Sequence, residues 1–428
     1  MLDALINAFR APDIRRRILF VLGILVVYRL LAQVPLPGVD HDQLKAFFDK
    51  NSAFGIIDLF AGGGLSQLSI VGLAMNPYIN ASIIMQLMTG VIPSLQALSR
   101  EGEYGRQRLN QYTRYLTVPM ALLQAFGILS ALGHQSPPVI IGGFGLGNAM
   151  SWVQMVSMTA GAVLLMWLGE LITEKGIGNG ISFIIFAGIV SRAPGAIGGF
   201  LTTPNLPLVI GFAIIAIVSV AVIIYIQEGQ RRIPIQYASR VRGRRMYQGG
   251  QTFLPLRVNQ AGVIPIIFAI SILLFPQQIA SYFTGSEVGW VKSIANGIVT
   301  FFNPRTIPYV ALYFLLTVGF TYFYTAFTFK PDDTAEQLRK NGGFIPGIRP
   351  GRPTADYLAR VVTRITIAGA LFLGIVATLP TLLGLIFPSL SSIALGGTGL
   401  LIVVSVIVET MKQIEAQLLM RNYEGFIR

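Results

Sequence analysis

The sequence predicts an all-α polytopic membrane protein with ten transmembrane helices. Three observations lead to this fold class. Of the 428 residues, 53% are hydrophobic and only 12% are charged, a balance that the core of a soluble protein does not explain. Apolar runs of membrane-spanning length recur along the whole chain. The lysine and arginine residues are concentrated in alternate connections between these runs.

Ten runs are long enough to cross a bilayer, since a spanning helix needs about 20 mainly apolar residues. The predicted spans are residues 18–34, 72–92, 113–132, 152–172, 181–198, 208–227, 262–283, 307–328, 365–387 and 398–418. Residues 1–17 are predicted to be a cytoplasmic segment with an amphipathic start at the membrane surface. The even count gives an N-terminal half, 18–198, a C-terminal half, 208–418, and a tail, 419–428.

Spans two and seven correspond under this division, and both are irregular. Span two carries Pro77, and span seven carries Pro265 and Pro276. Matched interruptions in two halves are typical of a transport pathway between the halves. The alternative is that proline is simply commoner in membrane helices than in soluble ones.

The basic residues predict the orientation. With the N-terminus placed in the cytoplasm, 26 of the 32 lysine and arginine residues fall on the cytoplasmic side and 5 on the other. The excess includes two long basic connections, 229–261 and 329–364. The positive-inside rule therefore predicts that both termini are cytoplasmic.

The composition excludes several classes of chemistry. The chain has no cysteine, and its two histidines, His41 and His134, fall outside the predicted spans, so disulfides and Cys or His metal clusters are excluded within one chain. No phosphate-binding loop is present, and no span holds paired carboxylates. We therefore expect no catalysis, no cofactor and no metal. A secondary transporter of a small solute remains an alternative, because sodium coupling through backbone carbonyls needs few charges.

The stretch at 54–93 is too long for one span and too interrupted for two. Gly62, Gly63 and Gly64 break its first half, because glycine lets the backbone turn where a helix would continue. We interpret it as a short helix that enters the membrane region, breaks and is followed by a true span. Irregular backbone at that depth must be packed in protein or line a cavity. The alternative is a loop on the external surface.

Apolar residues at helical spacing mark two of the spans. Met75, Ile79 and Ile83 recur at every fourth position, as do Ile181 and Ile185, so each set shares a helix face. Such stripes are usually ordinary packing or lipid contact. The sharper hypothesis is a hydrophobic constriction that closes by losing its water.

Several long motifs then follow one another in the order of a known family. They are ALSREGEYGRQRLNQYTRY (97–115), MWLGELITEKGIGNGISFIIFAGIV (166–190), QEGQRRIPIQYA (227–238), GRRMY (243–247), LPLRVNQAGVIPIIFA (254–269), GGFIPGIRPGRPT (342–354) and GGTGLLIVV (396–404). Together they resemble the SecY family, the channel subunits of the bacterial Sec translocon, from the first span to the tail. The resemblance implies a protein-conducting channel of the inner membrane, with two pseudo-symmetric five-helix halves around a central pore.

The resemblance also implies sites, carried over by position. The pore ring falls on Met75, Ile79, Ile181, Ile185, Ile267 and Ile402. A re-entrant plug helix spans 56–68, with Ile56, Ile57, Leu59, Phe60, Gly62, Gly63, Gly64 and Leu65. A lateral gate between spans two and seven has Ile83, Gln86, Asn259 and Ile264. Counted along the predicted spans, the ring residues do not share one depth, so their common level follows only from the resemblance.

Arg349 is singled out by its flanks in the second basic loop. Pro346 and Pro350 restrict the backbone, and Gly347 and Gly351 permit tight turns, so the arginine is expected at a stiff loop tip. With Arg244 and Arg245 it is predicted to form a docking surface for a motor or for ribosomal RNA. The resemblance implies these partners: the small membrane subunits SecE and SecG, the SecA motor ATPase, the ribosome, translocating polypeptides and membrane lipid.

Overall fold

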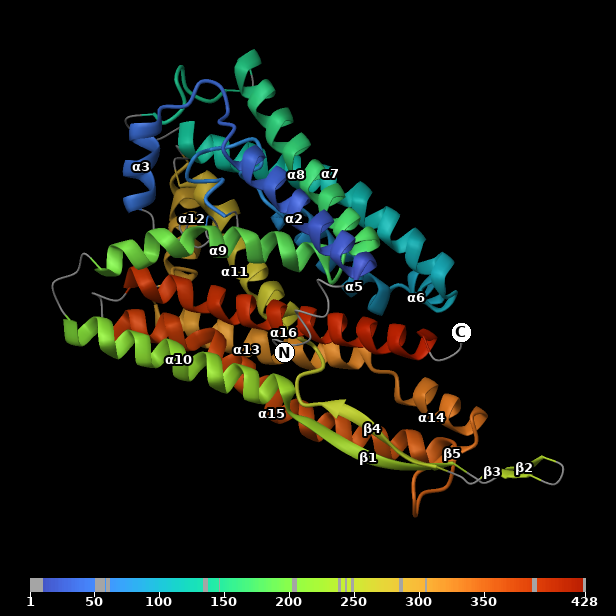
Figure 1. Ribbon diagram of the computed structural model, residues 1–428. Coiled ribbons are helices and arrows are strands. Elements are labelled where there is room, and N and C mark those ends of the chain that lie inside the picture. The colour runs from blue at the N-terminus through green and yellow to red at the C-terminus, as the bar shows by residue number, and fades with distance from the viewer. Residues whose placement is uncertain are drawn as a thin grey trace.

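The computed structural model describes residues 11–50, 58, 62–133, 138–145, 147–201, 206–237, 240–242, 245–247, 250–284, 288–304, 306–386 and 391–425. Helices dominate these residues, as the all-α prediction requires (Figure 1). The predicted amphipathic start of the chain, residues 1–9, lies outside them.

Two groups of helices make up the body of the protein (Figure 1). The earlier helices are α2 (Pro12–Ala32), α3 (His41–Lys50), α5 (Asn76–Val91), α6 (Pro93–Arg100), α7 (Glu103–Gly133), α8 (Ala149–Lys175) and α9 (Gly180–Leu201). The later ones are α10 (Leu206–Glu228), α11 (Ile264–Phe283), α12 (Gly289–Phe301), α13 (Ile307–Thr328), α14 (Pro331–Lys340), α15 (Arg352–Ile386) and α16 (Ser391–Gly425).

Each group packs within itself and meets the other along two seams. Helix α7 packs against α5 and α8, while α15 lies against both α13 and α16. The groups join where α9 contacts α16 and where α11 contacts α5 and α7. One continuous apolar core draws residues from both groups.

The chain is a multi-pass membrane protein. By length and composition, four described segments can cross a membrane: Glu103–Gly133, Ala149–Lys175, Ile307–Lys340 and Arg352–Leu385. Helices α5 and α6, bent by 99° relative to each other, give a fifth if they count as one span. Shorter apolar stretches lie in α9, α10 and α11. The count of ten spans stays a prediction.

Two prolines that were predicted to interrupt spans instead begin helices. Pro77 lies in the first turn of α5, and Pro265 lies in the first turn of α11. Proline is tolerated there because the first N–H groups of a helix have no helical partner. Pro276 does lie inside α11. The helix of span two begins at Asn76, four residues after the predicted start of the span.

The last two helices extend well beyond their apolar runs. Helices α15 and α16 have 35 residues each, which at 1.5 Å per residue is about 52 Å. The hydrocarbon core of a bilayer is only about 30 Å thick. Helix α15 begins at Arg352, ahead of the predicted span 365–387. Its polar first turns therefore precede the apolar run.

The first basic connection, 229–261, is a β-hairpin, which the charge pattern alone did not predict. A three-stranded antiparallel sheet has the order β4–β1–β5, and β2 pairs with β3. The strands are β1 (Gln230–Tyr237), β2 (Arg240–Arg242), β3 (Arg245–Tyr247), β4 (Gln251–Arg257) and β5 (Gly343–Phe344). The two basic connections therefore form one sheet, because β5 belongs to the second of them.

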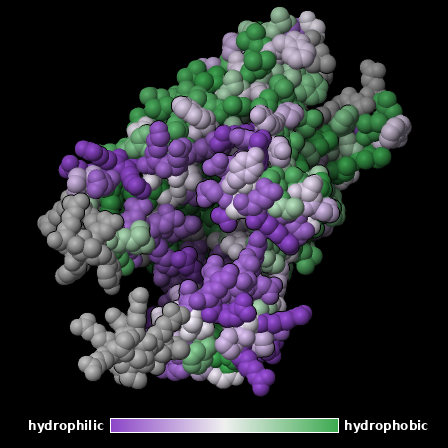
Figure 2. All heavy atoms as spheres, turned by 90° about the vertical axis from the view of Figure 1, so that its right-hand side faces the viewer, coloured by the Kyte–Doolittle hydropathy of each residue, from purple (hydrophilic) through white to green (hydrophobic). Residues whose placement is uncertain are grey.

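A separate small core attaches this sheet to the first turns of α15. Ile233 and Leu256 from the hairpin, together with Ile345, pack against Leu358 and Val362 of α15. The alternation along β1 buries Ile233 and Ile235 and leaves the residues between and before them exposed, as a half-buried strand does. Figure 2 shows the face of the molecule at this end, where hydrophilic residues gather around a recess.

Candidate functional site

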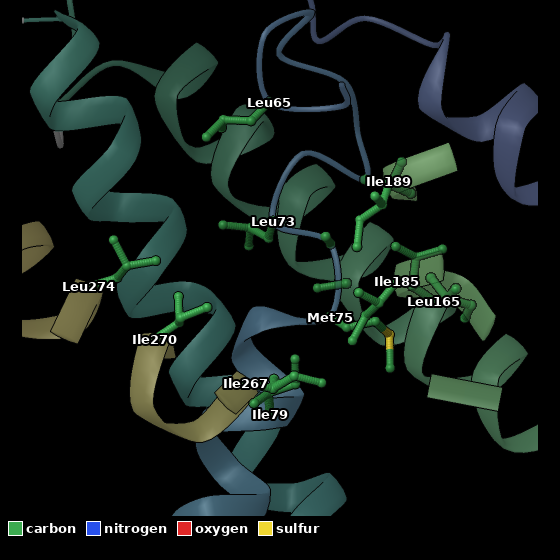
Figure 3. Close-up of a cluster of buried hydrophobic side chains, with 14 of the residues drawn as sticks. Leu65, Leu73, Met75, Ile79, Leu165, Ile185, Ile189, Ile267, Ile270 and Leu274 are labelled. Atoms are coloured by element: carbon green, nitrogen blue, oxygen red, sulfur yellow. The ribbon is translucent and has the colours of Figure 1, made fainter. Parts of the chain in front are cut away.

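The predicted ring residues come together in the centre of the apolar core. Met75, Ile79, Ile185, Ile267 and Ile402 are all less than 8% exposed and belong to one cluster, and Ile181 packs against it while partly buried. They come from four helices, α5, α9, α11 and α16, with Met75 directly before α5. In Figure 3, Met75 lies beside Ile185, and Ile79 lies beside Ile267. The structure therefore gathers apolar side chains from both helix groups into one cluster, and we call these six residues the collar.

The segment from Gly62 to Met75 lies inside this core as a series of turns. Gly62 and Gly63 have φ of +62° and +86°, a conformation that favours glycine. The predicted plug helix therefore does not continue through 62–68, while Ile56, Ile57, Leu59 and Phe60 lie outside the described residues. Gly64 is buried, and Leu65, Leu68 and Leu73 are fully buried. Most of the segment is therefore packed within the protein, with Gln67 exposed, and it is not a loop on the external surface.

Backbone hydrogen bonds join this segment to the stretch after α2. The Leu36 N–H donates to the Leu68 carbonyl at 2.9 Å, and the Ile70 N–H donates to the Val34 carbonyl at 3.0 Å. Asp58 is buried, and its Oδ1 accepts from the backbone N–H groups of Leu65 and Ser66 at 3.0 and 2.8 Å. The carboxylate therefore satisfies buried N–H groups that the irregular turns leave without helical partners.

Glycines in α8 allow this segment and α9 to approach closely. A Cβ at Gly161 would overlap the carbonyl oxygen of Ile70, and one at Gly180 of α9 would overlap that of Gly169. The side chain of Met75 reaches the same helix, because its Cε lies 3.5 Å from the Cβ position of Gly169. Small residues at helix contacts are typical of membrane proteins, where they let backbones come together.

Gly161→Ala is expected to lower the thermal stability of the purified protein in detergent. The added methyl group meets backbone at Ile70, which cannot rotate away, and overpacking of this kind costs about 1–3 kcal/mol. Gly90→Ala is the matched control, because nothing lies within 4 Å of a Cβ at that helical position. Equal melting temperatures for the two variants would contradict the close approach of α8 and the buried segment.

The predicted gate residues lie in or shortly before α5 and α11, two helices that contact each other. Ile83 is buried in α5, and Ile264 begins α11, partly buried. Gln86 donates through Nε2 to the Ser82 hydroxyl at 3.3 Å, and Asn259 donates through Nδ2 to the Gly262 carbonyl at 3.1 Å. Both bonds are local, because their partners lie four and three residues away along the chain, so neither bond joins two helices.

Both gate amides keep a buried oxygen without a hydrogen bond. Within the described residues, Gln86 Oε1 and Asn259 Oδ1 have no partner. An unsatisfied buried acceptor costs about 1–3 kcal/mol, and opening the seam to water would remove that cost. Asn259 also lines a polar cavity of about 150 Å³ together with Gln227, Glu409 and Lys412.

Of the predicted docking residues, the structure describes Arg349 and the backbone of Arg245. Arg349 is exposed in the loop before α15, and Gly347 and Gly351 beside its prolines have φ of +81° and +102°. Its carbonyl accepts from the Thr354 hydroxyl at 2.8 Å, which fixes the backbone of the loop. Arg245 begins β3, and Arg244 lies outside the described residues.

Comparisons with known proteins agree with this architecture. The family model of SecY matches residues 69–411. The protein translocase subunit SecY of Streptomyces coelicolor is 44% identical over 443 residues, with 100% of both chains covered. The protein of the same name from Corynebacterium glutamicum is 45% identical over 446 residues, again with 100% of both chains covered.

Solved structures show the same fold. A structure of a protein-conducting channel matches with a TM-score of 0.67 and 19% identity, over 93% of this chain and 91% of that chain. Sec61 in a canine ribosome–channel complex from the endoplasmic reticulum matches with a TM-score of 0.63 and 18% identity, over the same shares. The sequence matches, which run the full length of the chain, show that it belongs to the SecY family.

Proposed function

We propose that this chain is a protein-conducting channel that passes unfolded secretory polypeptides across the membrane and releases hydrophobic segments sideways into lipid. It has no chemistry of its own and is not an enzyme, and a partner motor or the ribosome drives the movement. Relatives that are named protein translocase subunit SecY support this function at 44–45% identity over the full chain.

One observation of the structure supports the proposal: apolar side chains from four helices share one buried cluster with residues of an irregular, mostly buried segment. A polypeptide must pass while water and ions are held back. Charged groups in the collar would bind some segments and repel others, whereas an apolar constriction excludes ions by losing its water. We infer that Met75, Ile79, Ile181, Ile185, Ile267 and Ile402 form this constriction. The segment 56–68 acts as its plug.

Sideways release follows from partition of each passing segment between channel and lipid. A leucine or phenylalanine at the centre of a span favours lipid by about 0.3–0.6 kcal/mol, and an aspartate or lysine opposes it by about 3 kcal/mol. We infer that the gate is the seam between α5 and α11, with Ile83 and Ile264 in contact with the core and Gln86 and Asn259 nearby. The side-chain oxygens of Gln86 and Asn259 have no hydrogen-bond partner in the closed seam. They therefore favour an open seam, in which water can bind them.

The finer features of the channel are part of the same proposal. We infer ten spans in two pseudo-symmetric halves, 18–198 and 208–418, with both termini in the cytoplasm and the chain in the inner membrane. The basic loop tips would dock the SecA motor and the ribosome, and SecE and SecG would complete the complex in the membrane. The ribosome-bound Sec61 neighbour supports the ribosome as a partner.

The other candidate function, secondary transport of a small solute, has no support from the comparisons. All of the relatives and solved structures reported above are translocase subunits or protein-conducting channels. The hairpin and the loop before α15 give the protein a basic surface that a solute carrier does not need.

Fixing the segment to its surroundings is expected to block transport. Gln33 and Ser66 line one cavity, so Gln33→Cys with Ser66→Cys can be bridged by a short bifunctional thiol reagent, and the chain has no native cysteine to interfere. Transport of a secretory protein into vesicles is measured before and after bridging. Each single-cysteine variant, treated with the same reagent, is the control. Normal transport through the bridged channel would rule out the plug.

A further inference from the structure

Arg29 is a charged residue near the end of the otherwise apolar part of α2, and it does not point to lipid. Its Nη1 donates to the Gly62 carbonyl at 2.9 Å and to the Ser191 hydroxyl of α9 at 3.0 Å. The Ser191 hydroxyl lies 2.6 Å from the Gly188 carbonyl and 3.3 Å from that of Gly62. Helices α2 and α9 therefore converge on the carbonyl oxygen of one glycine.

The backbone at this point fits with little room to spare. A Cβ at Gly62 would lie 2.5 Å from the Tyr28 hydroxyl oxygen and 2.6 Å from Cα of Gly188. The turn at Gly62 therefore sits directly on α9, one helical turn away from Ser191. Such contact defines one position of the turn, because a displacement along either helix would break the hydrogen bonds to Arg29 and Ser191.

No acidic side chain shares this charge within the described residues. The polar cavity beside it, about 200 Å³, is lined by Arg29, Ala32, Gln33, Gly62, Gly63, Ser66, Gln67 and Ser191. Arg29 makes no ion pair among the described residues, so a backbone carbonyl is its principal acceptor. A hydrogen bond from a charged donor is roughly twice as strong as one between neutral groups. In place of a carboxylate, Arg29 therefore binds a backbone carbonyl of the proposed seal.

We propose that Arg29 and Ser191 form a latch that holds the Gly62 turn in the closed position. Arg29 is thus a positioning residue for opening of the channel. In the closed state its guanidinium binds the Gly62 turn. When the turn leaves, water in the adjoining cavity accepts hydrogen bonds from Arg29 Nη1 and the Ser191 hydroxyl instead. The proposal rests on the proposed function, in which the buried segment is the seal.

The experiment measures release of the segment separately from loss of the seal. Leu65 is fully buried and lies three residues after Gly62, so it moves with the turn. Leu65→Cys gives a reporter in a chain without cysteine. Its labelling by a membrane-impermeant maleimide, added from each side of the membrane in turn, reports opening. Resting ion conductance in planar bilayers reports the seal.

Arg29→Met, which keeps an apolar helix, is expected to raise the labelling rate about tenfold to a hundredfold, the equilibrium change that loss of a charged hydrogen bond produces. Ser191→Ala should give a smaller rise. Arg29→Lys retains one donor and should fall between Arg29→Met and the parent. Leu30→Met is the control, because this neighbouring side chain is 64% exposed and should leave the rate unchanged.

The two readouts separate this proposal from the proposed function. Faster labelling together with higher conductance supports both. Faster labelling with unchanged conductance supports the latch and shows that the segment is not the seal. An unchanged labelling rate in Arg29→Met overturns the latch, whatever the conductance does.

Discussion

Replacing Ile79, Ile185 and Ile402 together with serine is expected to raise the resting ion conductance of the channel by at least about tenfold. The three side chains are 6%, 1% and 0% exposed and come from three different helices of the collar. An apolar constriction excludes ions because water does not remain in it. Burying one such side chain is worth about 1.5–3 kcal/mol, and about 1.4 kcal/mol is already a factor of ten. Conductance of the purified protein in planar bilayers is the measurement.

The same chemical change on the outer surface is the matched control. Ile217, Ile307 and Ile375 are 69%, 75% and 53% exposed, so their replacement by serine removes equal apolar area without touching the collar. This triple variant should conduct like the parent at equal amounts of inserted protein. If the collar variant also conducted like the parent, the constriction would have to lie elsewhere in the channel.

The collar shows how far the sequence could predict the site. The four-residue spacing of Met75 and Ile79 gave a shared helix face, but counting from Gly72 placed them near the end of a span. The structure places turns, not helix, before Asn76, and these turns are themselves buried. The two side chains therefore lie inside the protein. A hydropathy count cannot supply this, because buried turns and helix share the same apolar composition.

The two basic connections show the opposite difficulty. Their charges predict the side of the membrane on which they lie, but they did not predict the hairpin of β1 and β4. The signal was present as the alternation of Ile233 and Ile235 with exposed residues. Helices α3 and α12 were missed for a related reason, since they have 10 and 13 residues, too few for a span. A search for spans passes over such elements.

Two polar residues in apolar stretches have partners that the sequence alone does not reveal. Arg29 is a charged residue within the first predicted span, 18–34. In the structure it binds Gly62, 33 positions away along the chain. Asp58 was not singled out, although it is a carboxylate within an apolar stretch and its oxygen binds two backbone N–H groups. Partners at such distances depend on the tertiary fold and cannot be inferred from local periodicity.

Arg349→Glu is expected to leave insertion of the channel intact and to cut motor-driven transport by at least about tenfold. The loop holds this arginine rigidly: Ile345 is buried against α15, and the Thr354 hydroxyl binds the Arg349 carbonyl. A side chain on a preorganised loop loses less entropy on binding, and the guanidinium can pair bidentately with a carboxylate or phosphate. Reversing one charge in such a contact commonly costs about 2–5 kcal/mol. Transport of a secretory protein into vesicles by the purified motor is the measurement.

Two further variants separate docking from simple charge. Lys330→Glu makes the same change of net charge in the same connection, at the exposed residue before α14, and should transport like the parent. Arg349→Lys keeps the charge without the fork of donors and should retain partial activity. With 26 basic residues predicted in the cytoplasm, the loss of one should not alter orientation. Full transport by Arg349→Glu would therefore show that Arg349 contacts no docking partner. Its only remaining role would be in the orientation of the protein in the membrane.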